Sequence, residues 1–224
     1  MASLRPEYGP ELPVLVARRM RWPERRTRIV ILGLFAALVL LQGARSLATS
    51  GSGLTDLLVT EPFAFTLGYR DGMERVRPEP GEVLRLVSKP GGSTDETFTV
   101  SELSLPPYTG DPAGVLPVLA GREVEALREE FPVGFRYRGD ARTRINDFPG
   151  HQILFQTRLG GRLYYGKRYL LLPEYEAPGP PPREGAELTL LSKYSKATPS
   201  VGAVGSFGLM KSALRSFRLG TERP

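Results

Sequence analysis

The apolar segment at residues 29–41 constrains this 224-residue chain more than any other feature. Its thirteen residues carry no polar side chain, and ten of them are Ile, Val, Leu or Phe. As a helix they rise about 20 Å, which is short of a hydrocarbon core near 30 Å. Extension through Ala48 gives twenty residues at the cost of admitting Gln42 and Arg45. Because the stem of Arg45 can reach the membrane interface, the sequence predicts a transmembrane signal anchor over residues 29–48.

The charges around this segment predict its orientation. Residues 1–28 hold seven arginines against three glutamates. Basic flanks stay in the cytoplasm, so residues 1–28 are expected to form a cytoplasmic tail. The rest of the chain is then extracytoplasmic, and the protein is expected in the cell membrane as a single-pass protein.

Two other interpretations of the apolar segment stay open. A cleaved signal peptide is the first, because the apolar core is short and residues 46–48 (Ser-Leu-Ala) resemble a cleavage site. A buried core helix is the second, although a helix that is apolar on every face needs a large surrounding protein. The long basic region and the twenty-residue span favour the uncleaved anchor.

Composition excludes several function classes. The formal net charge is +6, but residues 49–224 hold 22 basic and 21 acidic side chains, so we predict no nucleic-acid partner. The absence of cysteine removes disulfides, thiolate metal sites and cysteine nucleophiles. A single histidine argues against His-rich metal sites, and no cofactor is predicted. Arginine outnumbers lysine 25 to 5, which is typical of a high-GC bacterial genome.

The remaining sequence predicts a flexible tether at residues 49–59 and one domain at residues 60–224. The tether begins with a Gly/Ser-rich stretch. The clearest local signal is a hairpin, in which Gly160 and Gly161 join two alternating runs. A proline-rich loop is expected at residues 177–185. The predicted strands are 63–69, 83–88, 97–105, 133–138, 142–146, 152–159, 162–172 and 187–193.

Two helices are predicted between these strands. Asp111 and Pro112 are a helix start signal, although Pro117 disturbs the first turns. An apolar stripe follows at helical spacing, formed by Leu116, Ala120, Val124, Leu127 and Phe131. The final helix is expected to begin after Ser206 as its N-cap, with a stripe of Phe207, Met210, Leu214 and Phe217. This order predicts an α+β domain on a mostly antiparallel β-sheet flanked by helices.

Several runs of the domain resemble the PsbP-like fold, in particular the small exported LpqN-type proteins of actinobacteria. They are residues 146–152 (NDFPGHQ), the Gly-Gly hairpin, residues 166–173 (GKRYLLLP) and residues 214–217 (LRSF). The resemblance covers residues 60–224. It implies an antiparallel sheet with flanking helices and a non-catalytic accessory or binding role. Those lipoproteins carry a lipid-bearing cysteine, which is missing here, and the family fixes no functional residues.

The residues that could carry chemistry lie in no recognised motif. His151 follows Pro149 and Gly150 at the entry to a strand, with no serine or carboxylate beside it in a known pattern. Residues 202–205 lack a phosphate-binding signature and are expected to shape a loop before the last helix. The acidic pairs at residues 95–96 and 129–130 are expected to face solvent. The sequence therefore predicts no catalytic and no metal site.

One concentration of arginine stands above this background. Residues 133–169 hold eight basic side chains against two aspartates. Arginine forks suit phosphates and carboxylates, so this face is predicted to dock an anionic ligand. The candidate residues are Arg136, Arg138, Arg158, Arg162 and Arg168. The alternative is an ordinary polar sheet face whose partners are the acidic residues around 123–130.

Three functional hypotheses follow. The first is a binding or accessory module of the envelope whose partners are the lipid bilayer and an anionic polymer or envelope protein. The second is an enzyme, which predicts a pocket that gathers His151 or acids from distant strands. The third is a subunit of a larger membrane complex, which predicts a contiguous apolar patch on the domain.

Overall fold

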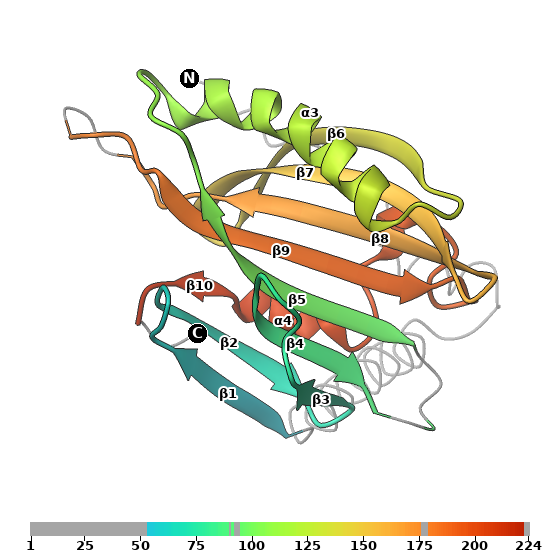
Figure 1. The fold of residues 1–224 in the computed structure, drawn as a ribbon. Helices are drawn as coiled ribbons and strands as arrows, with labels where there is room; N and C mark the ends of the chain where they lie inside the picture. Colours follow the sequence, from blue (N-terminus) through green and yellow to red (C-terminus); the bar gives the residue numbers. More distant parts are fainter. Residues whose placement is uncertain (1–52, 90, 92–94, 176–178, 222–224) are drawn as a thin grey trace, which may run out of the picture. The chain divides into compact units, whose positions relative to one another are not determined.

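Alternating apolar and polar residues build two antiparallel sheets in the part of the chain that the structure describes (Figure 1). The structure is a computed structural model, and it describes residues 53–89, 91, 95–175 and 179–221. The predicted cytoplasmic tail and the predicted membrane anchor lie outside these residues. Within the described ranges, no helix combines the length and the apolar character needed to cross a membrane.

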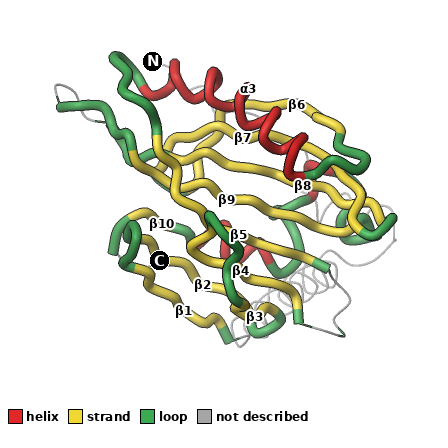
Figure 2. The backbone as a smooth tube through the Cα atoms, in the orientation of Figure 1, coloured by secondary structure: helices red, strands yellow, loops and turns green. Residues whose placement is uncertain are grey.

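The larger sheet has seven strands, and every pairing in it is antiparallel. In spatial order they are β3 (Met73–Val76), β4 (Glu82–Ser88), β5 (Glu96–Ser104), β9 (Glu184–Lys193), β8 (Arg162–Leu171), β7 (Phe148–Leu159) and β6 (Arg136–Ile145). The smaller sheet runs β1 (Leu54–Val59), β2 (Phe65–Arg70) and β10 (Arg218–Leu219). The backbone trace shows how strands dominate over helices (Figure 2). The predicted α+β class with a mostly antiparallel sheet is confirmed.

The seven-stranded sheet separates two apolar cores. Helix α3 (Pro112–Glu130) covers one face, where Leu116 and Leu127 pack against Ile153 and Phe155. Helix α4 (Met210–Ser216) and the small sheet pack on the core of the other face, around Phe98. A short 3₁₀ helix, η1 (Val201–Ala203), also contacts this part of the domain. The predicted α3 stripe is confirmed, because four of its five residues are buried and Val124 is half-buried.

The hairpin predicted from its two glycines is confirmed between β7 and β8. Gly160 and Gly161 have φ angles of 56° and 77°, the left-handed region that a tight two-residue turn requires. Farther along the hairpin, Gly166 pairs with Phe155, and a Cβ on Gly166 would lie 2.2 Å from the Phe155 ring. The aromatic ring therefore occupies the space above a glycine that no other residue can replace without movement.

The structure contains three strands that the sequence did not predict, β1, β3 and β10, and it joins two predicted strands into one. Leu54–Val59 form β1 inside the segment expected to be a tether, because Leu57 and Val59 pack against the core while Leu54 and Leu58 stay exposed. The two short strands predicted at 133–138 and 142–146 are one strand, β6. A bulge between Tyr137 and Gly139 bends it, with φ of 123° at the glycine, so the pairing with β7 continues across Asp140.

The last helix begins four residues after the predicted N-cap at Ser206. Gly208 adopts φ of 80°, and helix α4 begins only at Met210. The backbone amides of Leu209 and Met210 donate to Oε2 of Glu96, at 2.8 and 3.3 Å. Glu96 is 2% exposed, so the prediction that its acidic pair faces solvent is wrong for this residue. A carboxylate from a distant strand replaces the local serine cap.

Candidate functional site

Three of the five candidate arginines lie together on the sheet face opposite α3. Arg136 of β6 pairs with Gln156 of β7, and Nε of Arg138 donates to Oε1 of Gln156 at 2.9 Å. Arg158 lies two residues after Gln156, so its side chain projects from the same face of β7. All three side chains are exposed. We call Arg136, Arg138 and Arg158 the arginine face.

The arginine face carries charge that no acid of the described chain neutralises. Among the described residues, none of its three guanidinium groups forms an ion pair. Lys167 belongs to the same sheet face, but its Nζ donates to the Gly202 carbonyl at 3.0 Å and burial lowers its pKa. Lys167 is therefore a structural residue that ties β8 to η1. The available positive charge comes from the three arginines.

Arg162 is separated from this face by the turn of the hairpin. It pairs with Leu159, and strand alternation turns its side chain toward the α3 side of the sheet. The hairpin brings the backbones of Arg158 and Arg162 close together, but their side chains point to opposite faces. The structure therefore does not bring these two residues into one site.

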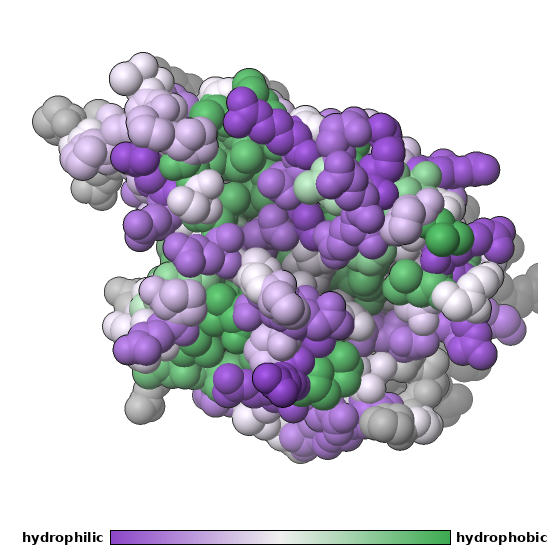
Figure 3. Space-filling view, in the orientation of Figure 1, coloured by the Kyte–Doolittle hydropathy of each residue, from purple (hydrophilic) through white to green (hydrophobic). Residues whose placement is uncertain are grey.

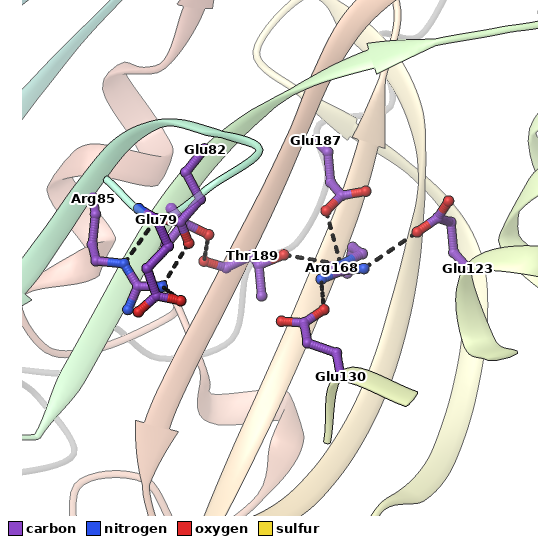
Figure 4. A network of polar contacts seen from close by, with 9 residues as sticks. Glu79, Glu82, Arg85, Glu123, Glu130, Arg168, Glu187 and Thr189 are labelled. Carbon is purple, nitrogen blue, oxygen red and sulfur yellow. Dashed lines mark hydrogen bonds and ion pairs between the residues drawn. The ribbon is translucent and has the colours of Figure 1, made fainter. Parts of the chain in front are cut away.

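Among the five candidate arginines, Arg168 is the one that is buried in the fold. It is 6% exposed and lies beneath α3 (Figure 4). Its guanidinium meets Glu123 at 3.2 Å and Glu130 at 2.6 Å, both from α3, and Glu187 of β9 at 3.1 Å. Nε of Arg168 also donates to the Thr189 hydroxyl at 2.9 Å. The expectation that Arg168 docks an external anion is therefore wrong, because internal carboxylates already hold it.

Burial and neighbouring charges shift the pKa values of Arg168 and Glu187 in this cluster. Burial alone would lower the pKa of Arg168, but Glu187, Glu130 and Glu123 raise it above its usual value. Burial also raises the pKa of Glu187 to about 7, aided by repulsion from Glu123 and Glu130 and opposed by Arg168. Three carboxylates around one guanidinium carry an excess of negative charge, and a proton on Glu187 relieves it.

A second paired arginine lies on the same side of the sheet as Arg168. Nη2 of Arg85 lies 2.9 Å from Glu79 and 2.7 Å from Glu82, as Figure 4 also shows. On this side Arg85 and Arg168 are therefore neutralised by the chain itself. The three guanidinium groups of the arginine face, on the other side, have no carboxylate partner in the described chain.

His151 has a carboxylate partner that the sequence did not reveal. Its Nε2 lies 2.5 Å from Oδ2 of Asp140, and the Tyr137 hydroxyl donates to Oδ1 of the same aspartate. These two hydrogen bonds lower the pKa of Asp140, and the pKa of Tyr137 rises to about 12. His151 is 4% exposed, and its Nδ1 has no partner among the described residues. The β6 bulge creates this contact, because it sets Asp140 beside His151 across the strand pair.

The His151 cluster brings an imidazole, a carboxylate and a phenol together. An Asp–His pair orients an imidazole, but general-base chemistry also needs a nucleophile or substrate within reach of the second nitrogen. Nδ1 of His151 is buried and touches no hydroxyl in the described structure. No three side chains that bind metals converge within the described ranges. His151 lines a cavity together with Asp111 and Glu174, which is the kind of pocket that the enzyme hypothesis predicted.

Apolar surface lies over the small sheet (Figure 3). The edge strand β1 contributes Leu54, which is 59% exposed, and Leu58, which is 54% exposed. An edge strand with unpaired backbone groups and apolar side chains is a surface on which another chain can pair. It is the kind of patch that the hypothesis of a complex subunit predicted.

No family model matches the chain, and no curated protein is similar to it in sequence. Among solved structures, the chain is similar to the PsbP protein of the cyanobacterium Synechocystis, CyanoP, with 11% identity and a TM-score of 0.50. That match covers 75% of this chain and 94% of CyanoP. It is also similar to LpqN of Mycobacterium tuberculosis, a protein involved in cell envelope biogenesis. There the identity is 16% and the TM-score 0.39, over 62% of this chain and 78% of LpqN.

The fold defines the class of this domain. The similarity to CyanoP, together with the antiparallel sheet and its flanking helices, supports a PsbP-like α+β fold. The fold resemblance inferred from the sequence is thereby confirmed at the level of architecture. At this identity the likeness describes the fold alone, and function must be argued from the surface of the domain.

Proposed function

We propose that this chain is a single-pass bacterial membrane protein whose extracytoplasmic domain is a non-catalytic binding module for an anionic component of the cell envelope. The observation that carries the proposal is the arginine face, where three exposed guanidinium groups lack carboxylate partners in the described chain. Planar guanidinium forks bind phosphates and carboxylates in two-point contacts. Headgroups of anionic lipids and phosphate-bearing wall polymers supply such groups.

The proposed topology brings the domain to its ligand. In this proposal residues 1–28 form the cytoplasmic tail, residues 29–48 the anchor, and the chain from β1 onward the binding domain. The cluster of seven arginines before the apolar segment supports this orientation. Membrane fractionation followed by N-terminal sequencing tests the anchor. We expect the intact N-terminus in the membrane fraction, and a mature chain that begins at Thr49 would contradict the anchor.

Binding to vesicles tests the docking function. The full chain in neutral-lipid nanodiscs is mixed with vesicles that contain phosphatidylglycerol, or with isolated cell-wall material, and sedimented. We expect the triple variant R136S/R138S/R158S to bind at least about tenfold more weakly, since each exposed charge contact contributes a fraction of a kcal/mol to about 1 kcal/mol. Added salt should weaken the binding of the unmodified chain.

A control variant with the same net charge shows whether binding depends on the arginine face or on the total charge of the chain. The variant R122S/K196S/R215S removes three exposed basic residues that form no ion pair among the described residues and that lie outside the arginine face. Its net charge equals that of the first variant. Equal loss of binding in both variants would refute the arginine face as a site, because only the total charge would then matter.

The second candidate ligand of the domain is a partner protein. The exposed apolar edge of β1 favours this candidate. Photo-crosslinking from position 58 in native membranes tests it, with position 118 on α3 as a control that is also apolar and at least as exposed. Capture of one defined partner from Leu58, and not from Val118, would support a complex subunit. Equal capture from both positions would contradict it.

A further inference from the structure

A cavity of about 220 Å³ lies on the α3 side of the sheet, beside the start of the helix. It is bounded by the first turns of α3, the edge strand β6 with its neighbour β7, and the segment after β8. Its lining includes Pro112 and Leu116, which are both buried, and Pro149. The volume equals that of roughly seven water molecules, at about 30 Å³ each. This is room for a small molecule with an apolar body and not for a polymer.

Two acids border this cavity, and the chain already engages both of them. Glu174 meets Arg144 at 3.1 Å, and Asp111, immediately before α3, has an interaction of its own within the chain. Arg142 of β6 also lines the cavity, and its guanidinium forms no hydrogen bond or ion pair with any described residue. The charge available to a ligand in the cavity is therefore positive, and an anionic group fits it better than a cationic one.

Beside Arg142 lies a buried imidazole with one nitrogen that has no partner. Arg142 pairs directly with His151 of β7, so the two side chains are neighbours on the same face of the sheet. His151 lines the cavity and is 4% exposed. Asp140 holds its Nε2 at 2.5 Å, whereas its Nδ1 meets no polar atom of the described chain. An unsatisfied buried polar atom costs free energy, and a polar ligand group in the cavity would supply the missing partner.

The contact with Asp140 decides which proton His151 can donate to a ligand. Hydrogen bonds from Tyr137 and His151 lower the pKa of Asp140, so its carboxylate is ionised and accepts a proton from Nε2. An anion in the cavity would then meet the second N–H of the protonated ring, at Nδ1. Arg142 and His151 together form a donor set that suits one carboxylate. Phosphate carries more negative charge and is disfavoured, because two acids border the same space.

We propose that this cavity binds a small monocarboxylate with an apolar body. The carboxylate contacts the planar fork of Arg142 and accepts a hydrogen bond from Nδ1 of His151. The apolar body packs on Pro112 and Leu116, since cavities for small ligands combine apolar walls with a few convergent polar groups. The proposal does not rest on the docking function, because the arginine face lies on the opposite side of the sheet.

The single histidine of the chain is a direct reporter of this site. The full chain in detergent micelles is isotope-labelled at the ring nitrogens of histidine and titrated with 4-methylpentanoate, and NMR follows both nitrogens. We expect a saturable shift that is larger at Nδ1 than at Nε2, because Asp140 already holds Nε2.

Three further probes define the class of ligand. The first, 4-methylpentanamide, keeps the shape without the charge, and acetate keeps the charge without the apolar body. Each should bind at least about tenfold more weakly than 4-methylpentanoate, because each loses one of the two contacts. Inorganic phosphate should also bind more weakly, since it adds charge beside Glu174 and Asp111.

Variants locate the site. Arg142→Gln should weaken the binding of 4-methylpentanoate by about tenfold or more, while Arg136→Gln on the arginine face should leave it unchanged. Circular dichroism checks that each variant is folded. If Arg142→Gln does not fold, Arg142→Lys replaces it, and we expect weaker binding because lysine lacks the planar fork.

Three results would overturn the proposal. The first is the absence of a saturable shift at Nδ1. The second is an affinity for the amide or for phosphate that equals the affinity for 4-methylpentanoate. The third is unchanged binding in a folded Arg142 variant. Vesicle binding through the arginine face would persist in each case, so the failure of either proposal is recognised separately.

Discussion

At the level of single residues, the arginines of this domain divide by whether a carboxylate meets them. Arg168 and Arg85 are paired inside the domain, whereas Arg136 and Arg158 are exposed and form no ion pair in the described chain. A buried arginine that contacts three carboxylates stabilises the native state only while its positive charge and their negative charges stay balanced. The exposed arginines carry no such constraint and are available for binding.

The buried cluster predicts how stability depends on pH. Glu187 titrates near 7 in the native state and near 4.5 when unfolded, so between these values the native state binds the extra proton. Its contribution to stability is full at low pH and is lost as the pH rises through about 7. The free energy of unfolding should therefore fall by an amount on the order of 3 kcal/mol between pH 5 and pH 8.

The variant Glu187→Gln tests this dependence by urea unfolding at several pH values. The amide mimics the protonated carboxyl group, so we expect the variant to be more stable than the original chain at pH 8 and to lose this part of the pH slope. Glu129→Gln, an exposed residue of α3, is the control and should keep the original slope. Identical slopes for Glu187→Gln and the original chain would contradict the assignment.

At the level of elements, the N-terminal cap of α4 comes from a residue that is distant in the sequence, so local sequence patterns could not predict it. The serine at 206 has the residue type of an N-cap, but the left-handed Gly208 interrupts the chain and Glu96 of β5 meets the free amides instead. Only the packing of β5 against α4 creates this contact. Burial raises the pKa of Glu96, although the two amide bonds oppose that shift.

Removal of this cap should be costly. Glu96→Ala leaves two amides without an acceptor in a buried setting, and we expect a loss of about 2–3 kcal/mol in the free energy of unfolding. Glu96→Gln keeps an acceptor oxygen and should lose about 1 kcal/mol or less. Chemical denaturation measures both. Equal losses for the two variants would show that the carboxylate charge, and not the acceptor, stabilises α4.

The Gly166–Phe155 contact gives a second prediction at this scale. Gly166→Ala places a Cβ 2.2 Å from the buried Phe155 ring, so we expect a loss of about 1–3 kcal/mol in stability. Gly121→Ala in α3 meets no atom within 4 Å and should raise helix stability by up to about 1 kcal/mol. Thermal unfolding of both variants measures these effects. A neutral Gly166→Ala would refute the packing described for the hairpin.

Sequence patterns predicted the elements that local signals define. The Gly160–Gly161 turn and the stripe of α3 depend on residues close in the chain, and both are confirmed. The contacts that decide the site join distant residues: Arg168 with Glu187, and His151 with Asp140 across a bulge. Strand alternation sorts residues onto two sides of a sheet. It shows which side is buried or exposed only when the strand register and the position of the covering helix are known.

At the level of the whole molecule, the seven-stranded sheet assigns different chemistry to its two sides. The side beneath α3 contains the paired arginines and the cavity beside Arg142, and the other side carries the arginine face. A domain with nearly balanced charge thus carries three exposed guanidinium groups on one sheet face that no acid of the described chain meets. The membrane anchor stays a prediction from residues 29–48, and it would hold this surface within the envelope.

Protection of individual arginines in native membranes tests the docking claim most directly. Phenylglyoxal modifies accessible guanidinium groups, and mass spectrometry quantifies each site in native membranes and in the purified chain. We predict that Arg136, Arg138 and Arg158 are protected in native membranes while the exposed Arg122 and Arg215 react equally in both preparations. Equal modification of the arginine face in both preparations would contradict the account.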